Sequence, residues 1–465
     1  MKRIVVIGAG IGGLAAAHTI KKHRDEGNEV EVTLFESAQR AGGKILSERI
    51  DGFLCEYGPN SLLDNRPSAM KLIEEVGLKD KILNSNDDAR KRYILANGKL
   101  HQLPEGPGSF MTTGLISFFG KIRIITELFR AQGDPDADET IEEFAKRRLG
   151  KEAYEKLLDP MITGIFAGDP TKMSLKTCFE RIHELEMQYG GLFKAMMKLG
   201  KEKKKQGKKD DNAGPAGPGG TIVAFNDGLQ EVIDALAADL KGIIRYNTQV
   251  TYISKADEGY TVGITKADGS TNELKYDSVI VCTPTHVMRG MLNNLSQPIS
   301  DELAKIPYAP VAVIGVGFDK DGFNHPLDGF GFLIPKTEGR KILGCLWTSS
   351  IFAHRAPDGK VFLRLMIGGM RSPELVSLSD DELIELVLDE LKITMGITAK
   401  PIFTNIYKHE RAIIQFNVGH EKISSKIQWE LKKFPGIYLG CNTYGGIGID
   451  GAIKSSVAVA EEALS

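Results

Sequence analysis

The 465-residue chain has few cysteines, almost no net charge and no long apolar run. Its five cysteines are odd in number and form no Cys-x-x-Cys pair, so we expect no disulfide framework and no metal site, and a reducing compartment fits. With a net charge of −2, the chain lacks the excess of positive charge that is typical of nucleic-acid-binding proteins. No stretch approaches about eighteen uncharged apolar residues, and the chain enters an expected strand at once, leaving no room for a signal peptide. These absences predict a cytoplasmic protein.

What the chain does contain is a glycine-rich turn between an apolar strand and a helix. The strand Lys2–Ile7 leads into the run Gly8, Ala9, Gly10, Ile11, Gly12 and Gly13. Gly8 permits the tight turn, Gly10 lets the backbone approach a pyrophosphate, and Gly13 lets the helix pack closely on the strands. A second strand ends at Glu36, next to Ser37, where a carboxylate can accept ribose hydroxyls. We interpret this stretch as the pocket for the ADP half of a dinucleotide, with a chance glycine-rich turn as the alternative.

The segment after Glu36 favours FAD over NAD. Arg40, Gly43 and Lys44 belong to an Arg-Ala-Gly-Gly-Lys run, which can bring backbone and positive charge to the flavin side of the pyrophosphate. The alternative is that the two cations are solvated loop charges. Further along, the small residues of the turn Gly58, Pro59, Asn60 and Ser61 suit close approach to a flat ring.

The last segment repeats the order strand, glycine-rich turn and helix. Its turn contains Ile447, Gly448 and Ile449. A helix that begins here would present its N-terminus to the pyrophosphate or to the pyrimidine edge of a flavin, where it would stabilise negative charge. A simple connection between sheet and helix is the alternative.

The middle of the chain alternates in character. Residues 106–200 have a helical pattern, and residues 201–219 are charged and then rich in proline and glycine, which predicts a mobile surface linker. Strands are expected at 243–246 and 249–255, then a hairpin of 260–266 and 272–276, and a buried strand at 278–284. A second, largely antiparallel sheet is expected from Val311–Phe318, Gly331–Pro335, Lys341–Ser349 and Val361–Ile367. Within the helical part, the basic and apolar stretch Gly108–Arg130 would suit a membrane surface. A helix packed within its own domain is the alternative.

A set of motifs carries a family resemblance over nearly the whole chain. They are Gly8–Gly13, Glu36, Arg40–Lys44, Gly58–Ser61, Lys91–Ile94, Gly164–Pro170, Gly329–Pro335 and Gly344–Ser349. The first three occur across FAD-dependent amine oxidases, carotene desaturases and porphyrinogen oxidases. With the others, the chain resembles the oxygen-dependent porphyrinogen oxidases of haem synthesis.

The resemblance implies a mixed α/β and α+β fold with three parts. A discontinuous Rossmann-like FAD-binding domain is expected at 1–84, 220–294 and 410–465, a sheet-rich substrate domain at 85–105 and 295–409, and a helical domain, membrane-associating in related enzymes, at 106–200. The implied reaction removes six hydrogens from protoporphyrinogen IX or coproporphyrinogen III, and O2 reoxidises the flavin to give H2O2. The porphyrin would pass to a chelatase. Neither the preferred porphyrinogen nor the oligomeric state is predicted.

The resemblance also implies which residues line the site. Arg92 corresponds to an arginine that pairs with a substrate propionate, and guanidinium binds carboxylate bidentately. Arg66 falls where some relatives carry a substrate-facing lysine, and His409 could lie beside the flavin. The other implied substrate contacts are Asn60, Gly164, Ala167, Leu333, Leu346 and Met366, and Val250 is expected to contact the cofactor. The alternatives are surface charge for the arginines and structural roles for the rest.

Three alternative functions remain open. An amine or polyamine oxidase would have the same FAD-binding fold but would hold its amine substrate between aromatic residues. A carotene desaturase is disfavoured by the fixed cations near the expected pocket. A catalytically silent, porphyrin-carrying flavoprotein is the third. No side-chain nucleophile is expected, because positioning and flavin chemistry would carry the reaction.

Overall fold

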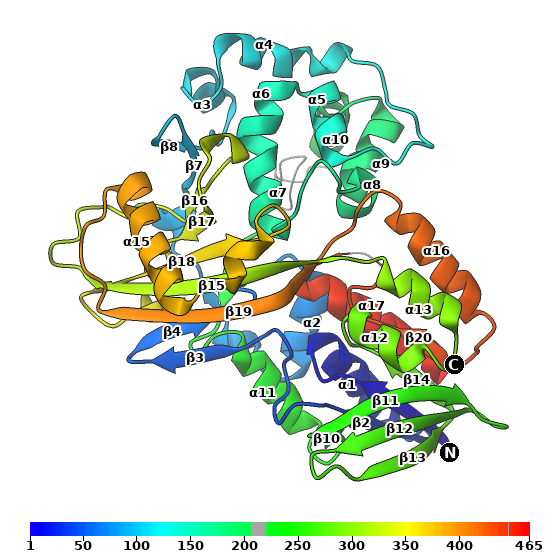
Figure 1. The fold of residues 1–465 in the computed structure, drawn as a ribbon. Helices are drawn as coiled ribbons and strands as arrows, with labels where there is room; N and C mark the ends of the chain where they lie inside the picture. Colours follow the sequence, from blue (N-terminus) through cyan, green and yellow to red (C-terminus); the bar gives the residue numbers. More distant parts are fainter. Residues whose placement is uncertain (206–219, 445) are drawn as a thin grey trace.

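The computed structural model describes residues 1–205, 220–444 and 446–465 (Figure 1). Two sheets and a helical region stand one above another, and both chain ends lie in the part built on the parallel sheet (Figure 1). Of the predicted linker, residues 201–205 continue a helix, and residues 206–219 lie outside the described residues. No helix in the described ranges combines the length and the apolar character that crossing a bilayer requires.

The parallel sheet is assembled from segments that lie far apart in the sequence. Its strand order is β10-β2-β1-β14-β20. The bounds are β1 Lys2–Ile7, β2 Val30–Phe35, β10 Ile244–Arg245, β14 Ser278–Val281 and β20 Ile437–Leu439. All four pairings are parallel. The sheet predicted from the opening strand is therefore confirmed, and the C-terminal strand joins it.

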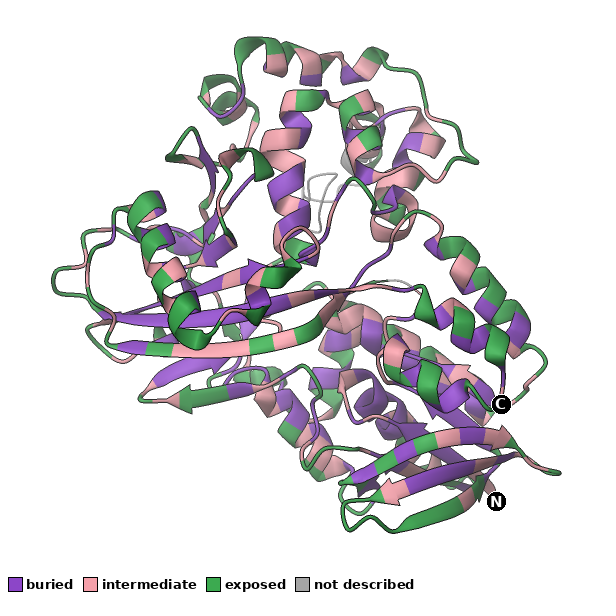
Figure 2. Cartoon of the chain, viewed as in Figure 1, coloured by how far each residue is buried: buried purple, intermediate pink, exposed green. Residues whose placement is uncertain are grey.

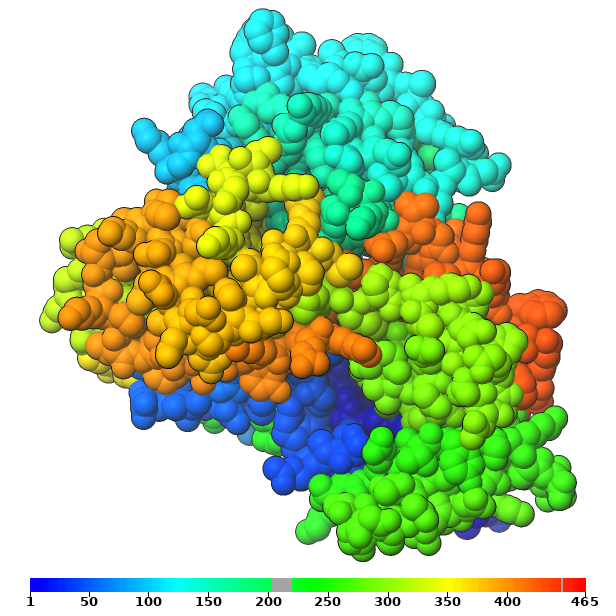
Figure 3. All heavy atoms as spheres, in the orientation of Figure 1, coloured from blue at the N-terminus to red at the C-terminus, as the bar shows by residue number. Residues whose placement is uncertain are grey.

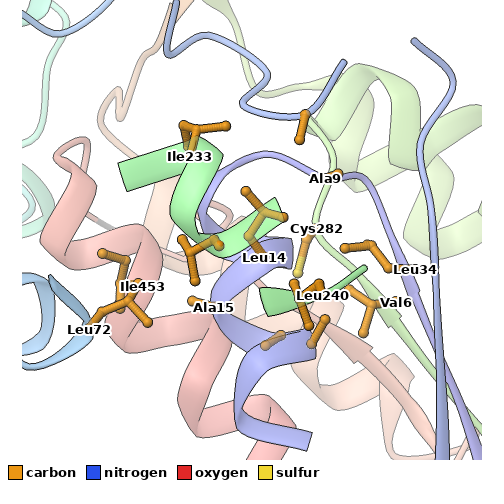
Figure 4. Close-up of a cluster of buried hydrophobic side chains, with 14 of the residues drawn as sticks. Val6, Ala9, Leu14, Ala15, Leu34, Leu72, Ile233, Leu240, Cys282 and Ile453 are labelled. Carbon is orange, nitrogen blue, oxygen red and sulfur yellow. The ribbon is translucent and has the colours of Figure 1, made fainter. Parts of the chain in front are cut away.

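Both faces of this sheet are covered, as its apolar strands require. Ile4 and Val6 face one core, and Val5 and Ile7 face another. The first core, part of which is shown in Figure 4, is closed by α1 Ile11–Asp25, α2 Pro67–Glu75, α11 Gln230–Asp239 and α17 Ile449–Leu464. The second is closed by β11 Thr248–Lys255, β12 Tyr260–Lys266, β13 Thr271–Tyr276, α12 Thr285–Leu292, α13 Gln297–Ala304 and α16 His420–Leu431.

A second, seven-stranded sheet runs in the order β19-β15-β18-β17-β16-β7-β8, and only its β16–β7 pair is parallel. The bounds are β7 Arg92–Ala96, β8 Lys99–Gln102, β15 Tyr308–Asp319, β16 Gly331–Leu333, β17 Ile342–Leu346, β18 Lys360–Gly368 and β19 Phe403–Ile414. The expected strands are present. Sequence analysis did not identify β19, and the predicted boundary between residues 409 and 410 falls inside it.

The two faces of this sheet have different partners. On one face, Phe332, Leu363 and Leu365 pack with Leu383 and Val387 of α15, Asp380–Met395. On the other face, Ile94 packs with the helical region, and Phe362 packs with the hairpin of β3 Ser47–Ile50 and β4 Phe53–Glu56. A small third sheet joins β5 Leu62–Leu63, β6 Leu83–Asn84 and β9 Ile222–Ala224.

The helical region occupies the segment where helices were expected. Its main elements are α3 Pro107–Thr112, α4 Phe118–Ile125, α5 Ile141–Arg148, α6 Lys151–Ala153, α7 Asp159–Phe166, α8 Leu175–Cys178, α9 Glu180–Tyr189 and α10 Leu192–Lys205. In Figure 2 the outer helices α3 and α4 carry much exposed surface, whereas α7, which descends toward the sheet, is largely buried or intermediate.

Candidate functional site

The glycines after β1 have different surroundings. Gly8 has φ +96°, which favours glycine, and a Cβ on Gly13 would overlap the carbonyl oxygen of Gly8. Gly10 caps α1 with φ −69°, and a Cβ there would meet no protein atom within 4 Å. Gly13 is therefore required for packing, whereas the space beside Gly10 is open. An open space at the start of a helix suits a pyrophosphate, because the helix N-terminus attracts anions.

Glu36 is fixed beside this turn. Its carboxylate accepts hydrogen bonds from the backbone N–H groups of Ala9 (2.7 Å) and Ala38 (2.8 Å), and from the hydroxyl of Ser37 (3.3 Å). A carboxylate has about four acceptor positions, so Glu36 retains capacity for a ribose hydroxyl. Nearby, the backbone N–H of Thr248 donates to the carbonyl oxygen of Glu36, which places Val250, buried in β11, on the strand that follows.

The Arg40–Lys44 loop lies against the glycine turn. The N–H of Gly42 donates to the carbonyl oxygen of Ala9 at 2.8 Å, and a Cβ on Gly43 would lie 3.4 Å from the Cα of Gly10. Arg40 donates to the carbonyl oxygens of Ala41, Gly43 and Ile45 at 2.8 to 3.1 Å. Arg40 therefore shapes the loop and is not a solvated loop charge.

Lys44 reaches across to the second sheet. Its ammonium donates to the carbonyl oxygen of Ala412 and lies 5.0 Å from the centre of the Tyr308 ring. The side chain keeps access to water through the cleft, but the surrounding protein lowers its pKa to about 8 by desolvation. Lys44 is thus a cation that is not paired with a carboxylate among the described residues.

The C-terminal helix begins close to the same place. Gly448 caps α17, whose first residue is Ile449, and Ile447 packs against both the second core of the parallel sheet and the helical region. The carboxylate of Asp450 accepts a hydrogen bond from the N–H of Ala69 in α2 at 2.9 Å. Ile447 therefore lies where the parallel-sheet part meets the helical region, and α17 begins directly after it.

Strand register places several predicted substrate residues on one face of the second sheet. Arg92 pairs with Gly331, Gly331 with Leu346, and Leu346 with Arg364. Two residues further along β16, Leu333 is opposite Gly344, which is opposite Met366. Residues directly opposite one another, and those two positions apart on a strand, point to the same side. Arg92, Leu333, Leu346 and Met366 thus share the face opposite α15, which we call the site face.

Helix α7 covers part of the site face. A Cβ on Gly164 would lie 2.5 Å from the Cδ2 of Leu333, so the absence of a side chain is what allows this approach. Ala167 ends α7 in the left-handed conformation, with φ +47°, and packs in one cluster with Met366 and Val313. The structure therefore brings these two predicted residues to the apolar part of the site face.

Arg92 stands at the outer end of this face. Its side chain is exposed, lies 5.6 Å from the centre of the Phe330 ring, and forms no ion pair among the described residues. Lys91, by contrast, pairs with Asp328 at 2.7 Å. Arg92 is therefore free to bind an anion.

Arg364 is a site residue that the sequence analysis missed. Its buried guanidinium donates to the carbonyl oxygens of Glu56 (3.1 Å) and Gly58 (2.6 Å), and desolvation lowers its pKa to about 10. It lines a small cavity with Asn60, Tyr57 and Asn405. The detectable signal was a charge inside an apolar strand, Val361–Ile367, because buried charge is costly unless it is hydrogen-bonded.

Asn60 faces this cavity with both polar atoms of its amide buried and without a hydrogen-bond partner in the described structure. Its backbone carbonyl accepts from Arg355, and Arg355 pairs with the buried Glu56 at 3.0 Å. A buried amide without a hydrogen-bond partner is unfavourable unless a ligand supplies the missing hydrogen bonds. The turn Gly58–Ser61, with Pro59 at its centre, is thus held rigidly while one polar group stays available.

His409 and Arg66 have different surroundings. The imidazole of His409 hydrogen-bonds to the carbonyl oxygen of Tyr57 at 2.9 Å, and desolvation lowers its pKa, so it is neutral at pH 7. It is opposite Val311 on the site face. Arg66 caps α2 and is partly exposed, and no hydrogen bond or ion pair among the described residues joins its side chain to the site face.

These observations fit a dinucleotide with a flat ring. The open space at Gly10, the acceptor Glu36 and the cation Lys44 suit adenosine diphosphate, and the unpartnered amide of Asn60 suits a polar ring edge. Figure 3 shows a hollow with dark-blue N-terminal residues at its floor, between blue, yellow-green and orange segments. A dinucleotide held there would lie between the glycine turn and the site face.

Comparison with known proteins shows the family of the chain. The flavin containing amine oxidoreductase family model matches residues 11–464. The chain is 32% identical to coproporphyrinogen III oxidase of Bacillus subtilis, over all of this chain and 98% of that protein. It is also 32% identical to protoporphyrinogen oxidase 1 of Arabidopsis thaliana, over 98% and 87%.

A crystal structure from Exiguobacterium sp. 255-15, provisionally assigned as a protoporphyrinogen oxidase, matches with a TM-score of 0.83 and 27% identity. It covers all of this chain and 98% of that one. The match to a flavin containing family confirms the predicted cofactor, FAD. The chain belongs to the flavin containing amine oxidoreductase family.

Proposed function

We propose that this flavoprotein oxidises a porphyrinogen, protoporphyrinogen IX or coproporphyrinogen III, to the porphyrin in haem synthesis. Six electrons are removed, and each pair reduces one O2 to one H2O2. The observation that carries the proposal is the site face, on which a cation, Arg92, stands at the end of the apolar row that includes Leu333, Leu346 and Met366. A porphyrinogen has the matching distribution, an apolar macrocycle with carboxylates on one side.

Each group of residues has a defined task in this proposal. Arg92 binds a substrate carboxylate and fixes the orientation of the macrocycle. Leu333, Leu346 and Met366 contact the ring, while Gly164 allows α7 to close over Leu333. Water is excluded by this apolar contact, and no side chain is needed as a nucleophile. Arg66 would contact substrate only from the start of α2, so we assign it the weakest role.

In this proposal the residues that would hold FAD come from four segments. Gly10 and Lys44 would bind its pyrophosphate, Glu36 its ribose, and Asn60, His409 and the start of α17 its ring system. When bound, FAD accepts a hydride from the substrate and passes electrons to O2. Neutral His409 cannot supply a positive charge at pH 7, so its effect would be through packing and hydrogen bonding.

Anaerobic mixing tests the proposal. The FAD-loaded protein is mixed separately with coproporphyrinogen III, protoporphyrinogen IX and spermine, and bleaching of the flavin band is followed. We expect bleaching with a porphyrinogen, and red porphyrin fluorescence with H2O2 after air is admitted. Bleaching by spermine alone would establish an amine oxidase instead. Porphyrin binding without bleaching would establish a carrier. The relative rates of the two porphyrinogens define the preferred substrate.

We also propose peripheral contact with a membrane, through α4 and the turn after it. Phe118, Phe119 and Phe129 are 67%, 81% and 81% exposed, and Ile122 and Ile125 are exposed beside them. Two of the three cations of Gly108–Arg130 are occupied internally: Lys121 donates to the carbonyl oxygens of Met111 and Thr113, and Arg123 to those of α5, whereas Arg130 is exposed. The contact would therefore be mainly apolar.

Vesicle sedimentation tests this contact. We expect the protein to bind phosphatidylcholine vesicles almost as well in high salt as in low salt, and the double variant Phe119→Ser/Phe129→Ser to remain in solution. Trp429→Ser removes a similarly exposed aromatic residue from α16 and is the matched control. Equal binding by wild type and the double variant would exclude this surface. A membrane position on the cytoplasmic side would suit transfer of a poorly soluble porphyrin to a chelatase.

A further inference from the structure

Two cysteines far apart in the sequence meet beside the glycine turn. Cys282 follows β14 and Cys441 follows β20, and these strands are paired with Val281 opposite Leu439. The N–H of Gly440 donates to the carbonyl oxygen of Val281 at 2.9 Å, which continues the pairing to the strand ends. This register places Gly440 opposite Cys282 and Cys441 one residue further along, where Cys441 adopts the left-handed conformation with φ +61°.

Their thiols share one set of contacts. The Sγ of Cys441 donates to the carbonyl oxygen of Cys282 at 3.2 Å. Both thiols also contact the hydroxyl of Ser456, at 3.7 Å from Cys282 and 3.8 Å from Cys441. The two sulfurs therefore share Ser456 as a neighbour, and the Sγ of Cys441 lies against the backbone of Cys282.

The pair adjoins the cofactor cradle. A Cβ on Gly12 would lie 2.5 Å from the Sγ of Cys441, so this sulfur rests on the first turn of α1. Figure 4 shows Cys282 in the core, near Ala9 and Leu14. Cys282 is buried, whereas Cys441 is only partly buried, so a small oxidant reaches Cys441 first.

The pKa of Cys441 is shifted in the opposite direction from that of the cysteines outside the pair. The Cys282 thiol, together with Ser456 and the charge of Lys44, lowers the pKa of Cys441. Burial raises the pKa of Cys55 and Cys178 to about 12 and also raises that of Cys345. Because the thiolate is the reactive form, Cys441 is the thiol best suited to attack an oxidant.

We propose that Cys282 and Cys441 form a peroxide-sensitive redox pair that fastens β14 to β20 at the cofactor cradle. The Cys441 thiolate attacks H2O2, the O–O bond breaks, and sulfenic acid and hydroxide form. The Cys282 sulfur then attacks the Cys441 sulfur, the S–O bond breaks, and water leaves as the disulfide forms. Two thiols and one peroxide thus give one disulfide and two waters. Peroxide from any source serves, so this inference is independent of the proposed substrate.

Thiol analysis of the FAD-loaded protein tests the redox pair. After brief exposure to H2O2, we expect two of the five thiols to be lost, the mass to fall by two hydrogens, and a peptide map to link Cys282 with Cys441. Dithiothreitol should restore both thiols. The Cys441→Ser variant should lose no thiol. In the Cys282→Ala variant, oxidation should stop at a sulfenic acid on Cys441, which a dimedone probe captures. Cys178→Ser, the control, should form the disulfide normally.

Thermal unfolding tests the fastening. The cross-link joins residues 159 apart and so restricts the unfolded chain strongly. We expect the oxidised wild type to unfold at a higher temperature than the reduced protein, and Cys441→Ser to show no difference. Retention of all five thiols, or the same thiol loss in Cys441→Ser, would overturn the redox pair. A lower unfolding temperature after disulfide formation would overturn the fastening.

Discussion

The guanidinium of Arg364 donates to the carbonyl oxygen of Gly58 at 2.6 Å. This bond joins the centre of the second sheet to the turn that presents Asn60. A second bond from the same guanidinium, to the carbonyl oxygen of Glu56, reinforces the connection. Arg364 therefore positions the turn between the cofactor cradle and the site face, although it lies 306 residues from Gly58.

Replacing Arg364 with methionine should loosen this turn. The buried carbonyl oxygen of Glu56 and the partly buried one of Gly58 would lose their donors, which costs about 1–3 kcal/mol each when no water replaces them. We expect the free energy of unfolding to fall by an amount on this scale and the KM for porphyrinogen to rise, as measured by urea unfolding and steady-state kinetics. Lys360→Met removes a cation from the exposed start of the same strand and is the control. Equal effects from both substitutions would refute a positioning role for Arg364.

Gly10→Val should separate cofactor binding from folding. The new side chain would meet no protein atom near its Cβ but would occupy the space for pyrophosphate, so we expect a folded, colourless protein. Absorbance and circular dichroism measure the two properties. Gly13→Ala is the contrasting change, because its Cβ overlaps Gly8, and it should reduce folding itself. A yellow, active Gly10→Val protein would contradict the assigned cradle.

Arg92→Ala should weaken porphyrinogen binding without affecting stability. A charge-assisted contact contributes about 1.5–3 kcal/mol, and the exposed arginine supports no other described ion pair. We expect the dissociation constant for substrate to rise by roughly 10- to 150-fold on that scale. Arg90→Ala, which removes a neighbouring arginine paired with Asp87, should leave it unchanged. If both variants bind substrate as the wild type does, Arg92 does not contact it.

Lys44 should make FAD binding depend on pH near 8. The lysine is charged below its pKa of about 8 and then attracts the pyrophosphate; above this pH it is neutral and the attraction is lost. Affinity should therefore be constant on the acid side and fall by up to about tenfold per pH unit on the alkaline side. Fluorescence titration from pH 6.5 to 9.5 measures this. Lys44→Arg should stay charged and remove the dependence, and Lys44→Met should bind weakly at every pH. A wild-type curve like that of Lys44→Arg would exclude Lys44 from the cradle.

Local patterns predicted the parts of the site that short segments encode. The turn Gly8–Gly13 and Glu36 could be placed because a strand, a turn and a helix follow each other directly. The common face of Arg92, Leu333, Leu346 and Met366 was implied only by the family resemblance, since it depends on the register of four strands. Arg364 and the Cys282–Cys441 contact were missed because their partners are far away in the sequence. The cations of α4 were interpreted as basic surface, whereas Lys121 is buried, because periodicity does not show that the chain just before α4 folds back over this lysine.

The assembly of the parallel sheet has a consequence for synthesis on the ribosome. Its central strand β1 is made first, but β20 is completed only at Leu439. At ordinary rates of translation, about 20 to 90 seconds separate the two. Until then the nascent chain lacks both an edge strand of the sheet and α17, which packs on α1. We therefore expect flavin to be held stably only after β20 and α17 have been made.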